Sequence, residues 1–219
     1  MPLPILYSLR QCPYAMRARM GIFLSRQPVM LRDIIMTNIP DDMVIASAKA
    51  EVPVLVLPDS SVIDQSLDVM IWALKNSDPD DLLLSNQSNA FEDMLDFIYR
   101  SDNEFVDNLK KYKAASRYHD ETEIHCREQC EVFISELELR LTKHDYLMGN
   151  SASLADYAIL PFIRQFSRVD RKWYLQAPYL KLQLWLDKHY QNPMFSKVMK
   201  KYPQWLESKE DVLFGCDFK

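Results

Sequence analysis

The stretch ILYSLRQCPYAMR at residues 5–17 places a cysteine where a short apolar run gives way to a helical pattern. Pro13 suits the first position of a helix, because its missing N–H would have no partner within the helix there. Unpaired N–H groups and the helix dipole favour a thiolate at Cys12. The thiolate is the reactive form, so Cys12 is a candidate nucleophile or redox thiol. The alternative is a buried cysteine that acts as a small hydrophobic residue.

The residues around this stretch predict an α/β domain. Apolar and β-branched runs predict strands at 4–8, 29–35, 52–57 and 61–63. Helical spacing and helix-start signals predict helices at 13–26, 40–50 and 65–74. The order β-α-β-α-β-β-α is thioredoxin-like, and that arrangement carries its chemistry at the first strand-to-helix turn. We assign residues 1–76 to this domain.

The rest of the chain predicts helices only. Residues 77–87 begin with turn-forming residues and are interpreted as a linker. The sequence Ser153-Leu154-Ala155-Asp156 is a capping-box pattern with aspartate in place of the usual glutamate. The predicted fold class is α/β plus all-α, with an all-helical domain at 88–219. Its expected helices lie within 88–115, 121–143, 153–166, 178–190 and 193–201.

Composition and charge argue against several classes of protein. The 219 residues are 48% hydrophobic and 26% charged, which suits a packed core. A formal net charge of −5 gives no basic footprint, so we expect no nucleic-acid partner. No run of apolar residues is long enough to span a membrane and the N-terminus has no signal-peptide pattern, so we expect no membrane partner. The three glycines do not cluster as nucleotide-binding loops require. Free thiols suit a reducing compartment, so we expect a cytoplasmic protein.

Two further motifs could bind a ligand beside Cys12. Pro53 begins a predicted strand and cannot donate to its ladder. If the Val52–Pro53 bond is cis, Val52 presents its backbone outward, where an extended thiol peptide can pair with it. Gln65 and Ser66 begin a helix, whose N–H groups and hydroxyl can hold a carboxylate. The plainer interpretations are a trans proline at a strand edge and a simple helix cap.

Other clusters carry weaker signals. The segment 119–130 holds two histidines and two cysteines, and Cys126 and Cys130 share a helical face. A structural zinc site needs four ligands in a closed set, so we interpret these as ordinary core or surface residues and expect no metal. Among the aromatic residues, Tyr112 is kept as a candidate for an acceptor-substrate pocket, although most such residues belong to the core.

The stretches at 7–15, 52–55 and 64–68, taken together, resemble the glutathione transferase superfamily. The cysteine-type members, omega-like enzymes and their bacterial relatives, are the most similar. The segment Ser153-Leu154-Ala155-Asp156-Tyr157 also resembles the capping box of the family's helical domain, so the resemblance spans the chain. It implies a glutathione site in the N-terminal domain. A homodimer is compatible with it, because the family is commonly dimeric.

The resemblance also implies roles for single residues. Cys12 would be catalytic, the segment before the proline would bind the cysteinyl part of glutathione, and the helix start at residue 65 would hold its γ-glutamyl end. Two positions depart from the family. Ile39 stands where many relatives have a basic residue that reaches the glycine carboxylate, and Ala50 stands where glycine is common. The implied glutathione-binding residues are Pro13, Tyr14, Lys49, Val52, Pro53 (in cis), Gln65 and Ser66.

A cysteine in place of a catalytic hydroxyl would form a mixed disulfide with glutathione. This predicts a glutathione-dependent thiol transferase, active in thiol transfer, deglutathionylation or dehydroascorbate reduction, with glutathione as co-substrate and an unknown small-molecule or protein thiol or disulfide as partner. Ala15 stands where a Cys-x-x-Cys pair has its second cysteine, so a second glutathione should release the first. Tyr7 is assigned to the strand. The alternatives are a non-enzymatic regulatory or interaction protein of this fold, and a conjugating transferase that acts on electrophiles.

Overall fold

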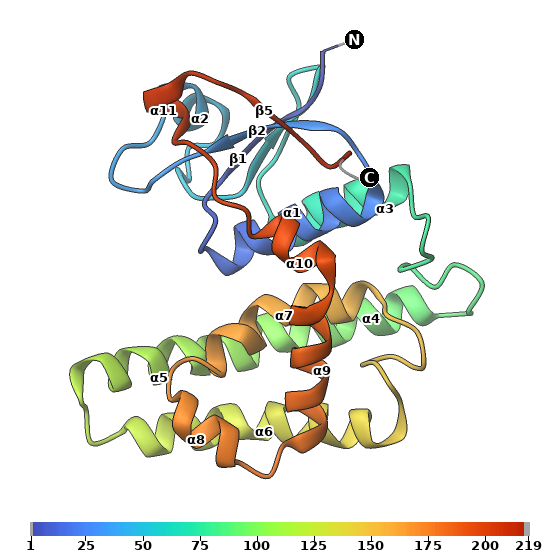
Figure 1. Cartoon of the computed structure of the whole chain (residues 1–219), viewed down its shortest axis with the longest axis vertical. Helices are drawn as coiled ribbons and strands as arrows, with labels where there is room; N and C mark the ends of the chain where they lie inside the picture. Colours follow the sequence, from blue (N-terminus) through green and yellow to red (C-terminus); the bar gives the residue numbers. More distant parts are fainter. Residues whose placement is uncertain (1, 217–219) are drawn as a thin grey trace. The chain divides into compact units, whose positions relative to one another are not determined.

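The structure is a computed structural model that describes residues 2–216 (Figure 1). Contacts divide these residues into two units: unit 1 holds residues up to 80 together with those from 192 onward, and unit 2 holds 81–191. The division differs from the domains predicted from the sequence, which placed everything from 88 to 219 in one helical domain. The cause is that the chain after residue 191 packs on unit 1, as described below.

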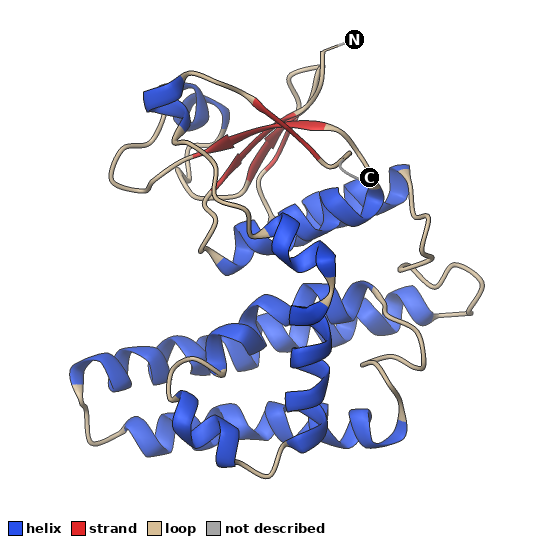
Figure 2. Cartoon of the chain, viewed as in Figure 1, coloured by secondary structure: helices blue, strands red, loops and turns tan. Residues whose placement is uncertain are grey.

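A five-stranded sheet forms the centre of unit 1 (Figure 2). The strand order is β4-β3-β1-β2-β5, with β1 parallel to β2 and the other pairs antiparallel. Alternate residues of β2 are buried, as expected for a strand with one face on a packed core. The strands are β1 (Ile5–Ser8), β2 (Val29–Asp33), β3 (Val54–Val56), β4 (Val62–Ile63) and β5 (Val212–Phe214).

Helices cover both faces of this sheet. Helices α1 (Pro13–Ser25), α3 (Ser66–Asn76) and α10 (Pro193–Val198) lie on one side, and α2 (Asp41–Ala46) and α11 (Trp205–Ser208) lie on the other (Figure 1). Gly21 sets the distance between α1 and α3, because a Cβ there would lie 2.6 Å from the Cα of Met70. The two helices can therefore pack backbone against backbone.

A buried ion pair ties α1 to the sheet. The guanidinium of Arg19 lies inside unit 1, where its Nε donates to Ser8 Oγ at 2.7 Å and its Nη2 pairs with the carboxylate of Asp33. Its Nη1 donates to the carbonyl of Val198 in α10 at 3.4 Å. Because an unpaired buried charge is costly, these contacts fix α1, β1, β2 and α10 to one another.

Unit 2 is helical. A π-helical turn (Ser101–Phe105) joins α4 to α5, and the ring of Phe105 stacks on that of Phe133 at 5.2 Å in the core. The predicted capping box is present: Asp156 is fully buried and accepts hydrogen bonds from Ser153 and from the indole of Trp185. The helices are α4 (Ala90–Arg100), α5 (Val106–Tyr118), α6 (Glu123–Lys143), α7 (Leu154–Phe166), α8 (Arg171–Gln176) and α9 (Leu180–Gln191).

The predicted fold class is confirmed. The strands and helices expected from the sequence are all present, most within a few residues of their expected ends, and α8, α11 and β5 are additional. Over residues 2–216, no helix combines the length and the apolar character that a membrane crossing requires.

Candidate active site around Cys12

Cys12 occupies the N-cap position of α1, as predicted. Its backbone is extended (φ −73°, ψ 125°), and Pro13 follows as the first helical residue. Its N–H donates to Leu9 at 3.0 Å, and its carbonyl accepts from Met16 at 2.9 Å. The side chain is partly buried and makes no cap to the helix. The sulfur therefore lies at the positive end of the helix dipole without serving as the cap.

The Val52–Pro53 peptide bond is cis and lies beside Cys12. The thiol of Cys12 is 3.9 Å from the carbonyl oxygen of Val52, across 40 residues of sequence. Both residues pack on a core cluster that includes Met43 of α2. Ala50, two residues before Val52, has a left-handed φ of 51°, which explains why glycine suits this position.

The start of α3 is the third part of the site. Gln65 is the N-cap residue in an extended conformation, and Ser66 is the first helical residue. Ser66 is therefore not the cap, so that plainer interpretation is wrong. The buried guanidinium of Arg17, on α1, donates to Ser66 Oγ at 3.5 Å, which links the helix of Cys12 to the start of α3. A serine oxygen that accepts from an arginine keeps its own proton for an acceptor such as a carboxylate.

Lys49 is engaged within the protein. Its ammonium lies 2.8 Å from Asp64, and the other oxygen of this carboxylate accepts from Ser47 at 2.8 Å. Hydrogen bonds from Lys49 and Ser47 lower the pKa of Asp64. The pair fastens the segment after α2 to the residues that precede Gln65, so Lys49 supports the site rather than reaching into it.

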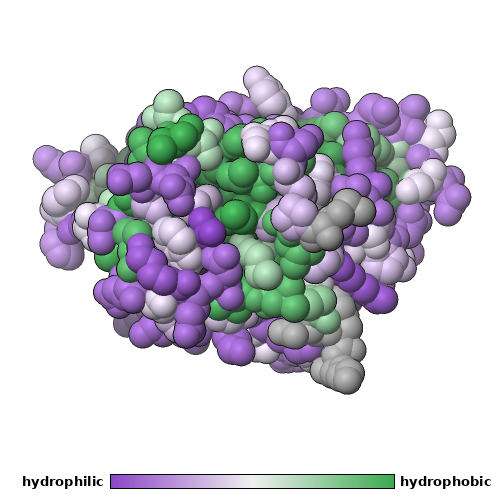
Figure 3. Space-filling model, turned by 90° about the horizontal axis from the view of Figure 1, so that it is seen from above, coloured by the Kyte–Doolittle hydropathy of each residue, from purple (hydrophilic) through white to green (hydrophobic). Residues whose placement is uncertain are grey.

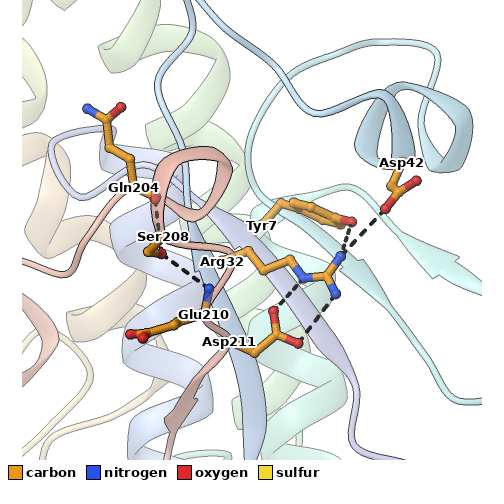
Figure 4. Close-up of polar contacts among 7 residues, drawn as sticks. All are labelled: Tyr7, Arg32, Asp42, Gln204, Ser208, Glu210 and Asp211. Carbon is orange, nitrogen blue, oxygen red and sulfur yellow. Dashed lines mark hydrogen bonds and ion pairs between the residues drawn. The ribbon is translucent and has the colours of Figure 1, made fainter.

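Tyr7 belongs to the sheet, as predicted. It is 2% exposed, and its hydroxyl accepts from Nη1 of Arg32 at 2.7 Å (Figure 4). Burial is the largest influence on this phenol and raises its pKa. The same guanidinium donates to Asp211 at 2.7 Å and lies 3.9 Å from Asp42 of α2. A phenol held in this way is poorly suited to activate a thiol.

Residues after α10 complete the cluster around Arg32. The ring of Trp205 lies 4.1 Å from the guanidinium and meets Tyr7 edge-on at 6.3 Å. Burial opposes the charge of Arg32, but its bonds to Asp211 and Tyr7 outweigh this and raise its pKa. The turn after α11 is fixed by Ser208, which donates to the Gln204 carbonyl and accepts from the N–H of Glu210 (Figure 4).

The remaining candidates are Tyr112, Cys126 and Cys130 of unit 2 and Tyr14 of α1. Tyr112 is buried in unit 2 against the ring of Phe166 at 5.9 Å, and burial raises its pKa to about 12. Burial also raises the pKa of Cys130 to about 12, and the thiol of Cys126 lies 3.9 Å from Thr122 Oγ1. Tyr14 lies in the first turn of α1. Among residues 2–216, no group of three acidic, histidine or cysteine side chains could hold a metal ion.

In unit 1 the Cys12 thiol lies 3.9 Å from the Val52 carbonyl, and Ser66 accepts a hydrogen bond from Arg17 of the helix that Cys12 begins. The sequence did not reveal Arg17, Arg19 or Arg32, whose partners lie up to 179 residues away. Arginine on an otherwise apolar helix face is the only signal that could have indicated Arg17 and Arg19.

Two family models match this chain. The model of the glutathione S-transferase N-terminal domain matches residues 6–80, and that of the C-terminal domain matches residues 116–193. The chain belongs to the glutathione transferase superfamily. Among curated proteins, none matches the chain in sequence.

Solved structures of other glutathione transferases are similar to this family member. One from Pseudomonas fluorescens, with two glutathione bound, has a TM-score of 0.77 and 14% identity, covering 90% of this chain and 92% of that one. The transferase URE2P6 from Phanerochaete chrysosporium, in complex with oxidized glutathione, has a TM-score of 0.77 and 15% identity, covering 90% of this chain and 94% of that one. The transferase Omega 2C from Trametes versicolor has a TM-score of 0.74 and 16% identity, covering 90% of this chain and 93% of that one. At such identities the likeness shows the fold.

Proposed function

We propose that this glutathione transferase family member is a thiol transferase in which Cys12 forms a mixed disulfide with glutathione. The observation that carries the proposal is the place of its sulfur, at the start of α1 and 3.9 Å from the Val52 carbonyl. An extended thiol peptide that pairs with the backbone of Val52 would bring its sulfur next to Cys12.

The reaction needs only thiols and disulfides. The thiolate of Cys12 attacks the glutathionyl sulfur of a mixed disulfide, the sulfur–sulfur bond breaks, and the other thiolate leaves and takes up a proton. The thiolate of a second glutathione then attacks the glutathionyl sulfur on Cys12, which releases oxidised glutathione and restores the Cys12 thiolate. The substrate disulfide is thus reduced to a thiol, and its glutathionyl group leaves with the second glutathione as oxidised glutathione.

Two features support glutathione as the co-substrate. The start of α3 offers backbone N–H groups and the Ser66 hydroxyl to the γ-glutamyl carboxylate. Two transferases of the same fold are described with glutathione or oxidised glutathione bound. We also propose that the protein is cytoplasmic, because a reduced Cys12 requires a reducing compartment.

The test is to incubate the protein with oxidised glutathione and map the adduct by mass spectrometry. We expect a glutathionyl group on Cys12, and we expect Cys12→Ser to abolish glutathione-dependent reduction of a small mixed disulfide. Cys216→Ser, at an exposed cysteine, is the control and should keep this activity. An unchanged rate in Cys12→Ser would refute the proposal, and conjugation of an electrophile that survives in this variant would favour the conjugating class.

A further inference from the structure

We propose that the preferred thiol at this site is a glutathione whose glycine carboxylate is masked as an amide, so that only its γ-glutamyl end carries a free carboxylate. The inference rests on the proposed function. It is carried by the distribution of charge on the two sides of Cys12.

The two ends of a bound tripeptide meet different surroundings. A γ-glutamyl carboxylate held at Ser66 and a cysteinyl backbone paired with Val52 leave the glycine end on the far side of Cys12. Ile39 packs on the same core cluster as Cys12 and Val52, and Met43 of α2 is part of that cluster. One extended residue spans about 3.5 Å, and only the glycine follows the cysteine of the tripeptide, so we place the glycine end beside the segment that leads into α2.

That segment carries negative charge and apolar side chains. Residues 34–48 include no lysine, arginine or histidine, and their charged groups are the exposed carboxylates of Asp41 and Asp42. Met36 and Ile45 are exposed apolar residues of the same segment, 43% and 83% exposed. Apolar groups stand among polar ones at the surface shown in Figure 3.

Two of the cations near this segment, Lys49 and Arg32, are already paired with carboxylates. Lys49 is paired with Asp64 at 2.8 Å. Arg32 is shared between Asp211 and Asp42, so this cluster has one positive and two negative charges (Figure 4). The backbone of Arg10, on the loop before Cys12, bonds to Asp33, and the charge of Arg10 also lowers the pKa of that carboxyl against the larger effect of burial. The C-terminal segment supplies Asp211 and thereby cancels a charge that would otherwise attract a carboxylate.

A free glycine carboxylate would therefore meet like charge, whereas an amide would not. Two carboxylates that each lie about 8 Å from the glycine carboxylate, in a water-like dielectric, correspond to about a fivefold difference in affinity. Salt at about 1 M, where the Debye length is about 3 Å, should screen this repulsion.

The experiment compares S-methylglutathione with its glycinamide by calorimetry on the full chain. Neither compound can form a disulfide, so binding is measured apart from chemistry. We expect the glycinamide to bind about fivefold more tightly at low ionic strength and the ratio to fall toward one at high salt. Equal binding, or tighter binding of the free acid, would overturn the inference while an adduct on Cys12 still upheld the proposed function. If neither compound bound and no adduct formed, both would fail.

Two variants test the charge directly. Asp42→Asn removes an exposed carboxylate, and Asp211→Asn releases Arg32, so both should lower the preference for the glycinamide by about twofold or more. Asp59→Asn makes the same change in the exposed β3–β4 turn and is the matched control. If all three variants kept the natural chain's preference for the glycinamide, the electrostatic cause would be contradicted.

Discussion

At the scale of single residues, Ala15 governs how the Cys12 mixed disulfide is released. It lies one helical turn after Cys12 and is fully buried in the same core cluster. We predict that Ala15→Cys removes the need for a second glutathione, because the introduced thiolate can attack the Cys12 sulfur and expel glutathione. Mass spectrometry after treatment with oxidised glutathione should show a protein without adduct and lighter by two hydrogens. Ala18→Cys is the control, and a stable adduct on Ala15→Cys would contradict the prediction.

His189 should make stability depend on pH. It is buried against the rings of Trp185 and Tyr157 at 4.6 and 5.3 Å, and burial, with a smaller effect of Lys188, lowers its pKa to about 4. The unfolded chain, with a histidine pKa of about 6.5, takes up the proton first as pH falls. The contribution of neutral His189 to the free energy of unfolding is therefore present above about pH 6.5 and is lost as pH falls toward 4.

The measurement is the free energy of unfolding by denaturant at about pH 7 and about pH 5. We expect the natural chain to lose about 2 kcal/mol more than His189→Phe over this interval. His125→Phe, at an exposed histidine, is the control and should follow the natural chain. Equal losses in the natural chain and His189→Phe would show that His189 does not titrate on unfolding.

Residues with local signals were predictable. Cys12 stands between a strand and a proline, and the capping box lies within four residues, so both could be found from the sequence. Arg32 could not, because its neighbours Tyr7 and Asp211 are 25 and 179 residues away and no pattern of spacing joins them. The roles assigned to Val52 and Ser66 in binding stay predictions.

At the scale of elements, α11 fastens the C-terminal segment to the sheet through Trp205. We predict that Trp205→Ala costs about 2 kcal/mol, because it removes a ring from both Arg32 and Tyr7. Hydrogen exchange should become faster at the amides of β5 and its neighbour β2. Glu207→Ala, exposed on the same helix, is the control. Unchanged exchange at residues 212–214 would mean that α11 does not hold β5.

Elements with clear apolar spacing or start signals were predictable, whereas the last strand was not. The helix at 13–26 and the strand at 29–35 follow clear apolar spacing, and they are found as α1 and β2. The strand β5 has three residues, and its pairing partner β2 lies about 180 positions earlier, which no local pattern reveals. The helix expected to reach residue 50 stops at Ala46, because Ser47 is extended and Ala50 is left-handed.

At the scale of the molecule, unit 1 is built from two separate stretches of chain. Removal of all residues after Gln191 would open the edge of β2, take Val198 from Arg19, and take Asp211 and Trp205 from Arg32. We predict a loss of several kcal/mol in unit 1, and association through the open strand edge. Denaturation and light scattering measure the two effects, with Val212→Pro as the milder variant. An unchanged midpoint would contradict the prediction.

The sequence was sufficient for the class of the fold and insufficient for its connectivity. Apolar spacing distinguishes a mixed domain from a helical one, because it reports the face that each element buries. It does not indicate which distant element a C-terminal segment packs against. Residues from 192 onward were therefore assigned to the helical domain that precedes them rather than to the unit that holds the sheet.

The pairing of β5 with β2 has a consequence for how the protein is made. Domains generally fold as units in the order of synthesis, from the N-terminus onward. Here the ribosome must translate every helix of unit 2 before β5, the last strand of the sheet, has been made. A nascent chain therefore holds an unfinished sheet, with this edge of β2 unpaired, until residue 214 has emerged.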